Sequence, residues 1–184
     1  GHRNWDTVLD LGEGWGSIGT AAAGVEFSTV GVDNAGVLYQ GTLHGYIRSR
    51  VQLDFAAQSD RNLLQRISKK AELSLSTVMV VWLSPECTLL SRANSMNTSR
   101  GCAHGPYTEH PNNLATATPE RLQEERAKFQ KCKLAIEEQM RALGEEDLLF
   151  AIENPKGSHL WDLDSVTSRL LEFKEKNWRI VEVD

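Results

Sequence analysis

Segments that predict strands and segments that predict helices alternate along the chain, and this alternation limits the fold more than any other feature. Short apolar, β-branched segments predict strands, and longer segments with apolar residues three and four positions apart predict helices. The expected strands are residues 5–11, 27–32, 50–53, 77–83, 148–152 and 178–183. The expected helices are residues 17–23, 36–44, 60–71, 119–143 and 164–176. With right-handed crossovers, this order predicts an α/β fold with a doubly wound, mostly parallel sheet and helices on both faces.

Polar residues mark the expected starts of three helices, because their side chains can accept hydrogen bonds from the free N–H groups of a first helical turn. The expected N-caps are Asp60, Thr118, and either Asp162 or Asp164. In the helix that Asp60 would begin, Leu63, Leu64 and Ile67 have helical spacing and predict a buried face.

Length, charge and cysteine content exclude several classes of protein. The chain has 184 residues, which suits a single domain over residues 1–184. Its formal net charge of −5 means that any binding of nucleic acid needs a local basic patch. The longest apolar run, residues 78–83, is too short to span a bilayer. The three cysteines fit no disulfide framework, so we expect a reducing intracellular compartment, cytoplasmic or nuclear.

A long polar segment follows the strongest expected strand. Residues 85–117 are rich in Ser, Asn, Thr, Gly and Pro, and a loop of this length inside a domain is usually functional. Because ligands bind at the carboxyl ends of parallel strands, we predict an active-site loop here. Cys102, His104 and His110 within it have a spacing that is poor for zinc, and we expect no metal site.

A glycine-rich turn joins the first expected strand to the first expected helix. Gly12, Gly14 and Gly16 allow a sharp turn and let a ligand approach the backbone at the start of the helix. Asp33 and Asp54 end the next two strands, where carboxylates can accept from ribose hydroxyls and from an adenine amine. This pattern favours an adenosyl ligand over a purely structural turn. A nicotinamide enzyme is less favoured, because no group suited to hydride transfer is visible.

A thiol and a carboxylate follow two further expected strands. Cys87 comes after the strand at 77–83, and Glu153 comes after the strand at 148–152. In a parallel sheet, the ends of these two strands would face one crevice. A thiolate is a strong carbon nucleophile, and a partly buried carboxyl group can act as an acid. The sequence therefore predicts that Cys87 and Glu153 form a catalytic pair.

Three segments carry a resemblance to a known family. Residues 10–16 (DLGEGWG) resemble its cofactor loop, residues 84–87 (SPEC) with Ser91 resemble its Pro-Pro-Cys segment, and residues 153–155 (ENP) resemble its Glu-Asn-Val segment. In the order and spacing of these segments the chain resembles the S-adenosylmethionine-dependent DNA cytosine-5 methyltransferases, most of all the small enzymes of phages and mobile elements. The resemblance implies a Rossmann-like class I methyltransferase fold, S-adenosylmethionine as the cofactor, DNA as the partner, and no membrane partner.

The resemblance also implies a role for each matching residue. Cys87 would attack carbon 6 of a flipped cytosine, and Glu153 would hold ring nitrogen 3 and the exocyclic amine. Asp33 would hold the ribose, and Asp54 would hold the adenine. The implied cofactor-binding residues are Asp10, Gly12, Glu13, Gly14, Gly16, Asp33, Asn34, Asp54 and Ser84. The implied substrate-binding residues are Pro85, Ser91, Arg92, Asn154 and Pro155.

The sequence departs from the family pattern at three places. Glu86 replaces a second proline before the cysteine, and a carboxylate there disfavours the thiolate. Gly12 replaces an aromatic residue, and the chain ends at Asp184, so we expect a missing segment or a second chain to supply the closing strands and the target-recognition part. These departures leave open a weakly active or inactive domain that binds cofactor, nucleic acid or a partner protein. A further alternative is an RNA cytosine or base-amino methyltransferase, although Cys87 stands where the amino-methyltransferases have an aromatic residue.

Overall fold

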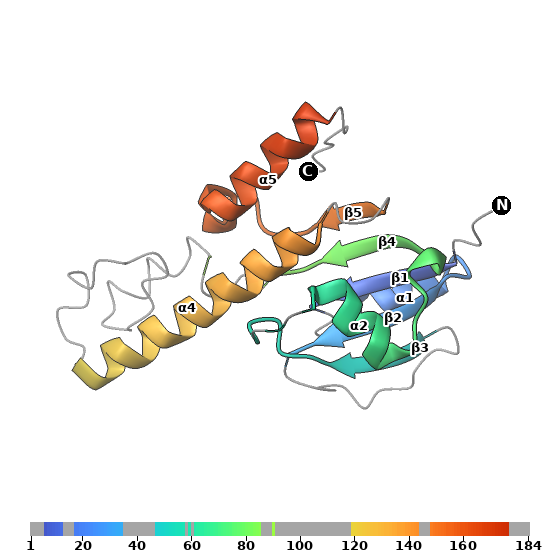
Figure 1. The fold of residues 1–184 in the computed structure, drawn as a ribbon, viewed down its shortest axis with the longest axis horizontal. Coiled ribbons are helices and arrows are strands. Elements are labelled where there is room, and N and C mark those ends of the chain that lie inside the picture. The colour runs from blue at the N-terminus through green and yellow to red at the C-terminus, as the bar shows by residue number, and fades with distance from the viewer. Residues whose placement is uncertain are drawn as a thin grey trace.

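The computed structural model describes residues 6–12, 17–34, 47–57, 59, 61–85, 90, 119–143 and 148–176. This part of the chain forms one parallel sheet with helices packed against it (Figure 1). The expected helix at 36–44, the expected strand at 178–183 and most of the loop at 85–117 lie outside the described residues.

The sheet has five parallel strands in the order β3-β2-β1-β4-β5. The strands are β1 (Thr7–Leu11), β2 (Ser28–Asp33), β3 (Ile47–Gln52), β4 (Val78–Leu83) and β5 (Leu149–Ile152). The prediction of an α/β, Rossmann-like fold with a parallel sheet is therefore confirmed. Because the chain adds β2 and β3 on one side of β1 and then returns to the other side, the strand order reverses between β1 and β4. In such sheets, the crevice outside the carboxyl ends of these two strands is where ligands bind.

Helices connect these strands within the described residues. They are α1 (Ser17–Ala23), α2 (Leu63–Ala71), η1 (Leu75–Thr77), α4 (Pro119–Ala142), η3 (His159–Asp162) and α5 (Asp164–Glu175), of which η1 and η3 are short 3₁₀ helices. Figure 1 shows α2 and α4 in front of the sheet, with α1 behind it. None of the helices that the structure describes has both the length and the apolar character needed to cross a membrane.

The main hydrophobic core lies between the sheet and the helices α2, α4 and α5. Leu9 and Leu11 of β1 are fully buried in it, because alternate side chains of a strand point to the same face. The helices contribute Leu63, Leu64, Ile67, Ile136, Met140, Val166 and Phe173 to the same cluster. Val8 precedes Leu9 in the strand, so its side chain points to the opposite face of the sheet. It is buried there, on the face where α1 packs against β1 and β2. Both faces of β1 are therefore covered, as its continuous apolar sequence requires.

The structure corrects several predicted boundaries. Asn62, rather than Asp60, caps α2, because its Oδ1 accepts a hydrogen bond of 2.8 Å from the backbone N–H of Gln65. The cap of α5 is Leu163, which makes no side-chain capping bond, and Asp164 is already helical. The helix follows η3 directly, and backbone hydrogen bonds at Leu163 connect the two: its N–H donates to Leu160, and its carbonyl oxygen accepts from Val166 and Thr167. The start of the helix therefore needs no polar cap. Strand β3 begins three residues before the expected residue 50.

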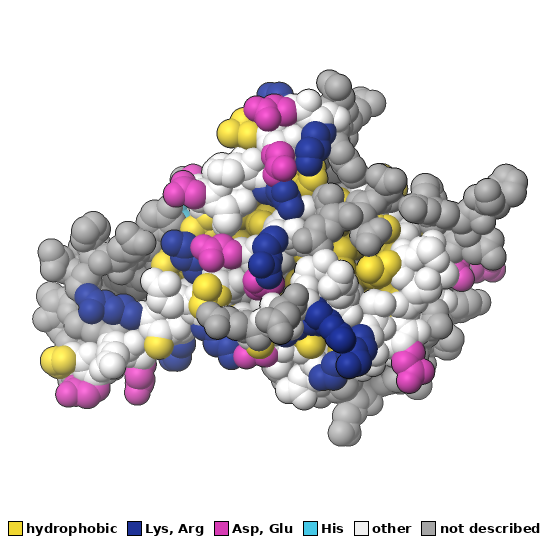
Figure 2. Space-filling view, in the orientation of Figure 1, with side chains coloured by type: hydrophobic (Ala, Val, Ile, Leu, Met, Phe, Trp, Pro, Cys, Tyr) yellow, Lys and Arg dark blue, Asp and Glu magenta, His cyan; other side chains and the backbone are white. Residues whose placement is uncertain are grey.

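Helix α4 consists of two halves with different surroundings. Its 24 residues span about 36 Å, whereas the six residues of β4 span about 20 Å, so one end of the helix extends past the sheet. In residues 132–142, Cys132, Ile136 and Met140 are buried. Among residues 119–131, no described side chain is buried. This projecting half carries charged side chains of both signs (Figure 2).

Candidate functional site

Hydrogen bonds between backbone groups extend the sheet past the carboxyl ends of its strands. Four such bonds of 2.8–2.9 Å join the first residue after one strand to a neighbouring strand: Gly12 N to Val32 O, Leu53 N to Asp33 O, Ser84 N to Leu11 O, and Glu153 N to Leu83 O. The starts of four loops therefore keep the alignment of the sheet. Candidate site residues lie at the ends of these strands. Those that the structure describes are therefore arranged along the carboxyl edge of the sheet.

Gly12 brings the loop after β1 into close contact with the loop after β4. Its φ is +91°, a conformation that residues with a side chain rarely adopt. A β-carbon at this position would lie 2.4 Å from the carbonyl oxygen of Ser84. Both the conformation and the available space therefore require glycine at the point where the strand order reverses.

Asp10 lies inside the sheet, and Asp33 lies at its edge. Asp10 is 1% exposed and stands between its cross-strand partners Gly31 and Trp82. Asp33 is half-buried at the carboxyl end of β2, and the carbonyl oxygen of the following Asn34 accepts from Nε2 of Gln52 at 3.4 Å. Of the two carboxylates, Asp33 is the one whose position suits direct contact with a ligand.

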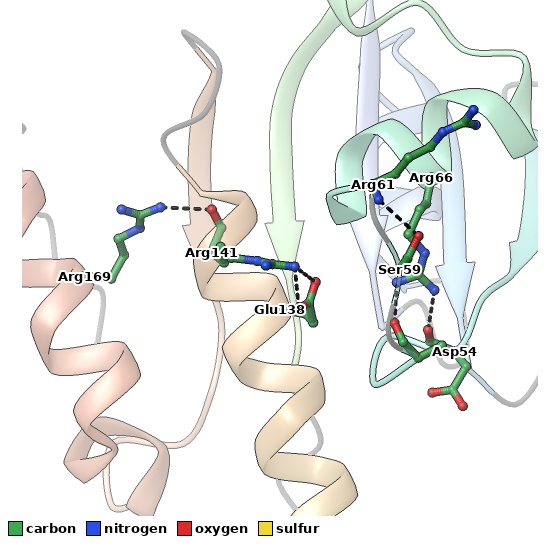
Figure 3. Close-up of polar contacts among 8 residues, drawn as sticks. Asp54, Ser59, Arg61, Arg66, Glu138, Arg141 and Arg169 are labelled. Atoms are coloured by element: carbon green, nitrogen blue, oxygen red, sulfur yellow. Dashed lines mark hydrogen bonds and ion pairs between the residues drawn. The ribbon is translucent and has the colours of Figure 1, made fainter.

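Asp54 follows β3 in a turn that two helices hold. Its Oδ1 accepts from the backbone N–H of Ala56 at 3.0 Å, and its Oδ2 lies 3.1 Å from Nζ of Lys131 on α4. From α2, the Arg66 guanidinium donates to the carbonyl oxygens of Asp54 at 2.7 Å and Ala57 at 3.2 Å (Figure 3). The hydrogen bond from Lys131 holds the pKa of the Asp54 carboxyl below its ordinary value, with smaller contributions from the Ala56 N–H and from Arg66. Asp54 is therefore an anionic acceptor at neutral pH.

The loops after β4 and β5 are joined directly. Nδ2 of Asn154 donates to the carbonyl oxygen of the buried Pro85 at 3.0 Å. Further along, the backbone N–H of His159 donates to the carbonyl oxygen of the fully buried Leu90 at 2.8 Å. The loop after β5 thus holds the loop after β4 at two points, residues 85 and 90, which lie on either side of Cys87 in the sequence.

Neighbouring contacts fix the orientation of both loops. Nε1 of Trp82 donates to Oγ of Ser84 at 3.1 Å. Nε1 of Trp161 donates to the carbonyl oxygen of Pro155 at 3.0 Å, so this tryptophan supports the loop after β5. The side chain of Glu153 is exposed, and its backbone is fixed to β4. The backbone of Glu153 is therefore fixed at the strand end next to the one that Cys87 follows, but its carboxyl group is exposed rather than partly buried as the sequence analysis assumed.

Several predicted residues cannot be placed. Glu13, Gly14, Gly16, Cys87, Ser91 and Arg92, together with Cys102, His104 and His110, lie outside the described residues. Within the ranges that the structure does describe, no group of three or more His, Cys, Asp and Glu side chains is arranged to hold a metal ion.

Two basic residues contact Asp54, the residue predicted to hold the adenine, and neither was among the predicted site residues. Lys131 belongs to the charged stretch of α4 and is 52% exposed, and it pairs with Asp54. Arg66 lies on α2 and contacts only backbone atoms of the turn. The available signal for Lys131 was the length of α4, because a helix longer than the strands must pass over the edge of the sheet.

Comparisons of the chain with models of protein families, with curated proteins and with solved structures find no match. The arrangement of the site itself is therefore the basis for assigning a function.

Proposed function

We propose that the chain is an S-adenosylmethionine-dependent methyltransferase domain that transfers a methyl group to carbon 5 of cytosine in DNA, with Cys87 as the nucleophile. The order β3-β2-β1-β4-β5 supports a ligand site at the carboxyl ends of β1 and β4. Gly12 at this point lets the chain turn sharply beside Ser84. The proposal joins this architecture to the sequence motifs on its edge.

The acidic residues along the edge fit an adenosyl cofactor. Asp33 ends β2, and Asp54 lies in the turn after the adjacent strand β3, on the same side of the reversal point. Carboxylates are suited to accept hydrogen bonds from the two ribose hydroxyls and from the exocyclic amine of adenine. S-adenosylmethionine, when bound there, supplies an electrophilic methyl group.

The bond from Asn154 to Pro85 is the observation that carries the catalytic part of the proposal. It joins the ENP segment to the SPEC segment, although 69 residues separate the two partners in the sequence. Cys87 is two residues beyond Pro85, and two residues of chain reach at most about 7 Å. Glu153 immediately precedes Asn154. A thiol and a carboxylate are thereby tied to the two partners of one hydrogen bond.

Cys87 and Glu153 are suited to two steps of cytosine methylation, the attack on carbon 6 and the binding of the ring edge. The thiolate of Cys87 forms a bond to carbon 6, and the electron pair of the 5,6 double bond then becomes available at carbon 5. Glu153 holds the ring edge at nitrogen 3 and the exocyclic amine, which orients carbon 5 toward the methyl donor. After carbon 5 has taken the methyl group, its proton leaves to a base and the thiolate departs, which restores the aromatic ring.

A cofactor-binding domain with little or no activity is the second candidate. Glu86 directly precedes Cys87, and a neighbouring carboxylate opposes formation of a thiolate and repels phosphate. This candidate keeps the adenosyl site at Asp33 and Asp54 but removes the chemistry at Cys87. Binding and methyl transfer must therefore be measured separately.

Two measurements test the proposal. The protein should bind S-adenosylhomocysteine in calorimetry and should transfer a labelled methyl group from S-adenosylmethionine to cytosine-containing DNA. Cys87→Ser should abolish transfer while binding persists, and Cys132→Ala serves as the control because Cys132 is buried in α4. DNA that contains 5-fluorocytosine should form an adduct that survives denaturation, because its carbon 5 has no proton to lose. Binding without transfer or adduct supports the second candidate, and absence of binding contradicts both.

A further inference from the structure

Asp54 is held by two contacts at its carboxylate and by a third contact at its backbone. The backbone N–H of Ala56 contacts Oδ1 at 3.0 Å, and Nζ of Lys131 contacts Oδ2 at 3.1 Å. The Arg66 guanidinium holds the backbone of the same turn at the carbonyl oxygens of Asp54 and Ala57. Figure 3 shows Arg66 reaching from α2 to the turn, while the Asp54 carboxylate points away from the guanidinium. Arg66 therefore positions the backbone, and Lys131 positions the side chain.

Lys131 stands where α4 changes its surroundings. The next residue, Cys132, is buried, whereas the residues before Lys131 belong to the projecting half. The packed half anchors the helix against the core, so the backbone at Lys131 is held in place. From there the long lysine side chain reaches the edge of the sheet. A loose helix end would not hold a carboxylate in one orientation.

The contacts leave room for a ligand at Asp54. A carboxylate has about four acceptor positions, and the Ala56 N–H and the Lys131 ammonium use one at each oxygen. The side chain of Asp54 is 43% exposed, so the remaining positions are open to solvent. These two donors favour one orientation of the carboxylate and leave its other acceptor positions accessible.

We propose that Lys131 is a positioning residue that orients the Asp54 carboxylate to accept from the exocyclic amine of adenine, and so makes the site selective for adenosyl over inosyl ligands. The inference rests on the proposed function, because it requires an adenosyl ligand at this edge. Inosine has a carbonyl oxygen in place of that amine and a hydrogen on ring nitrogen 1, so a carboxylate held at the amine position would meet an acceptor, and only a carboxylate free to shift would reach the neighbouring N–H. A mispositioned carboxylate would lose this selectivity before it lost general affinity.

The experiment compares two ligands on matched variants. Dissociation constants for S-adenosylhomocysteine and S-inosylhomocysteine are measured by calorimetry for the unaltered protein, Lys131→Met and Lys133→Met. Lys133→Met is the control, because it removes a lysine from the same helix. Lys133 forms no ion pair with Asp54 among the described contacts. We expect the unaltered protein and Lys133→Met to prefer the adenosyl ligand about tenfold or more. In Lys131→Met, the preference should fall to about threefold or less.

Each other outcome has a definite meaning. An unchanged preference in Lys131→Met overturns the positioning role and leaves the proposed function intact. Tighter binding of the adenosyl ligand by Lys131→Met also overturns it, because it would mean that Lys131 competes with the ligand for Asp54. If the unaltered protein binds neither ligand, the proposed function is wrong, and the positioning role proposed for Lys131 is then wrong as well. A thermal unfolding measurement on each variant confirms that the fold is retained.

Discussion

Two clusters at the carboxyl edge of the sheet are held by different kinds of contact. The first, here called the strand junction, consists of Gly12, Ser84, Pro85 and Asn154, and its described contacts join neutral groups, of which Pro85 is buried and the others are half-buried. The second, the Asp54 turn, comprises residues 54–57 and is held by the charged side chains of two helices. The Lys131–Asp54 pair is about half exposed, at 52% and 43%.

The contacts of the strand junction keep its geometry fixed, whereas the contacts of the Asp54 turn allow its geometry to adjust. Neutral contacts keep their strength when salt or pH changes, because they involve no net charge. Ion pairs between exposed groups are weak and are screened by salt. In the proposed function, the junction sets the distance between the two reacting side chains, which must not vary. The turn faces a ligand, where a modest and tunable contact is sufficient.

The largest effect should come from Gly12→Ala in the strand junction. The substitution forces a side chain into φ of +91° and against the carbonyl oxygen of Ser84 at 2.4 Å, so that two strands must shift. We expect a loss of about 2–4 kcal/mol in the free energy of unfolding, measured by denaturant titration. Gly24→Ala is the control, because Gly24 is exposed and its φ is not positive. Equal losses in both variants would contradict the close packing of the junction.

Asn154→Ala should have the next largest effect. It removes the bond to the carbonyl oxygen of Pro85 and leaves that buried acceptor unpaired, which costs about 1–3 kcal/mol in the free energy of unfolding. The loss should be independent of salt between low and high ionic strength. Pro155→Ala, at an exposed neighbouring position, provides the comparison. A loss that shrinks in salt would mean that charge, rather than this neutral bond, holds the junction.

The strand junction was more predictable from sequence than the turn. Glycine can adopt conformations that other residues avoid, whereas proline and the residue before it are restricted, so Gly12 and Asn154 signal their local structure directly. The apolar strands and the helical spacing of Leu63, Leu64 and Ile67 were equally direct, and the structure confirms the sheet and the buried helix face. These features depend on properties of the residues themselves.

The Asp54 turn depends on contacts between segments that are distant in sequence. Lys131 meets Asp54 only because α4 crosses the edge of the sheet, and a lysine in a charged stretch gives no sign of its partner. Likewise, Asp60 and Asn62 are both good caps by residue type, and only the structure identifies Asn62 as the cap. Long side chains reach several positions, so their contacts cannot be derived before the helices are placed.

Arg66→Met sharpens the comparison from the side of the turn. Two hydrogen bonds to backbone carbonyl oxygens are lost, and we expect a decrease of about 1–2 kcal/mol in the free energy of unfolding. Because Arg66 holds the backbone, affinity for adenosyl and inosyl ligands should fall together. Arg61→Met is the control, since the described hydrogen bond of Arg61 uses its backbone N–H (Figure 3). A change in ligand preference, rather than in overall affinity, would show that Arg66 acts on the carboxylate itself.

Lys131→Met should have the smallest effect on stability, about 0.5 kcal/mol or less, because the ion pair is exposed. Its effect on titration should be larger, since the hydrogen bond from Lys131 is the main cause of the lowered pKa of Asp54. A carboxyl pKa below its unfolded value contributes stability above that value, and the contribution is lost as the pH falls through the folded pKa. The variant should therefore show a higher Asp54 pKa by NMR titration and a smaller loss of stability on acidification than the unaltered protein. Added salt should reduce both differences, and if they persisted undiminished at high salt, the contrast between a neutral junction and a charge-held turn would be wrong.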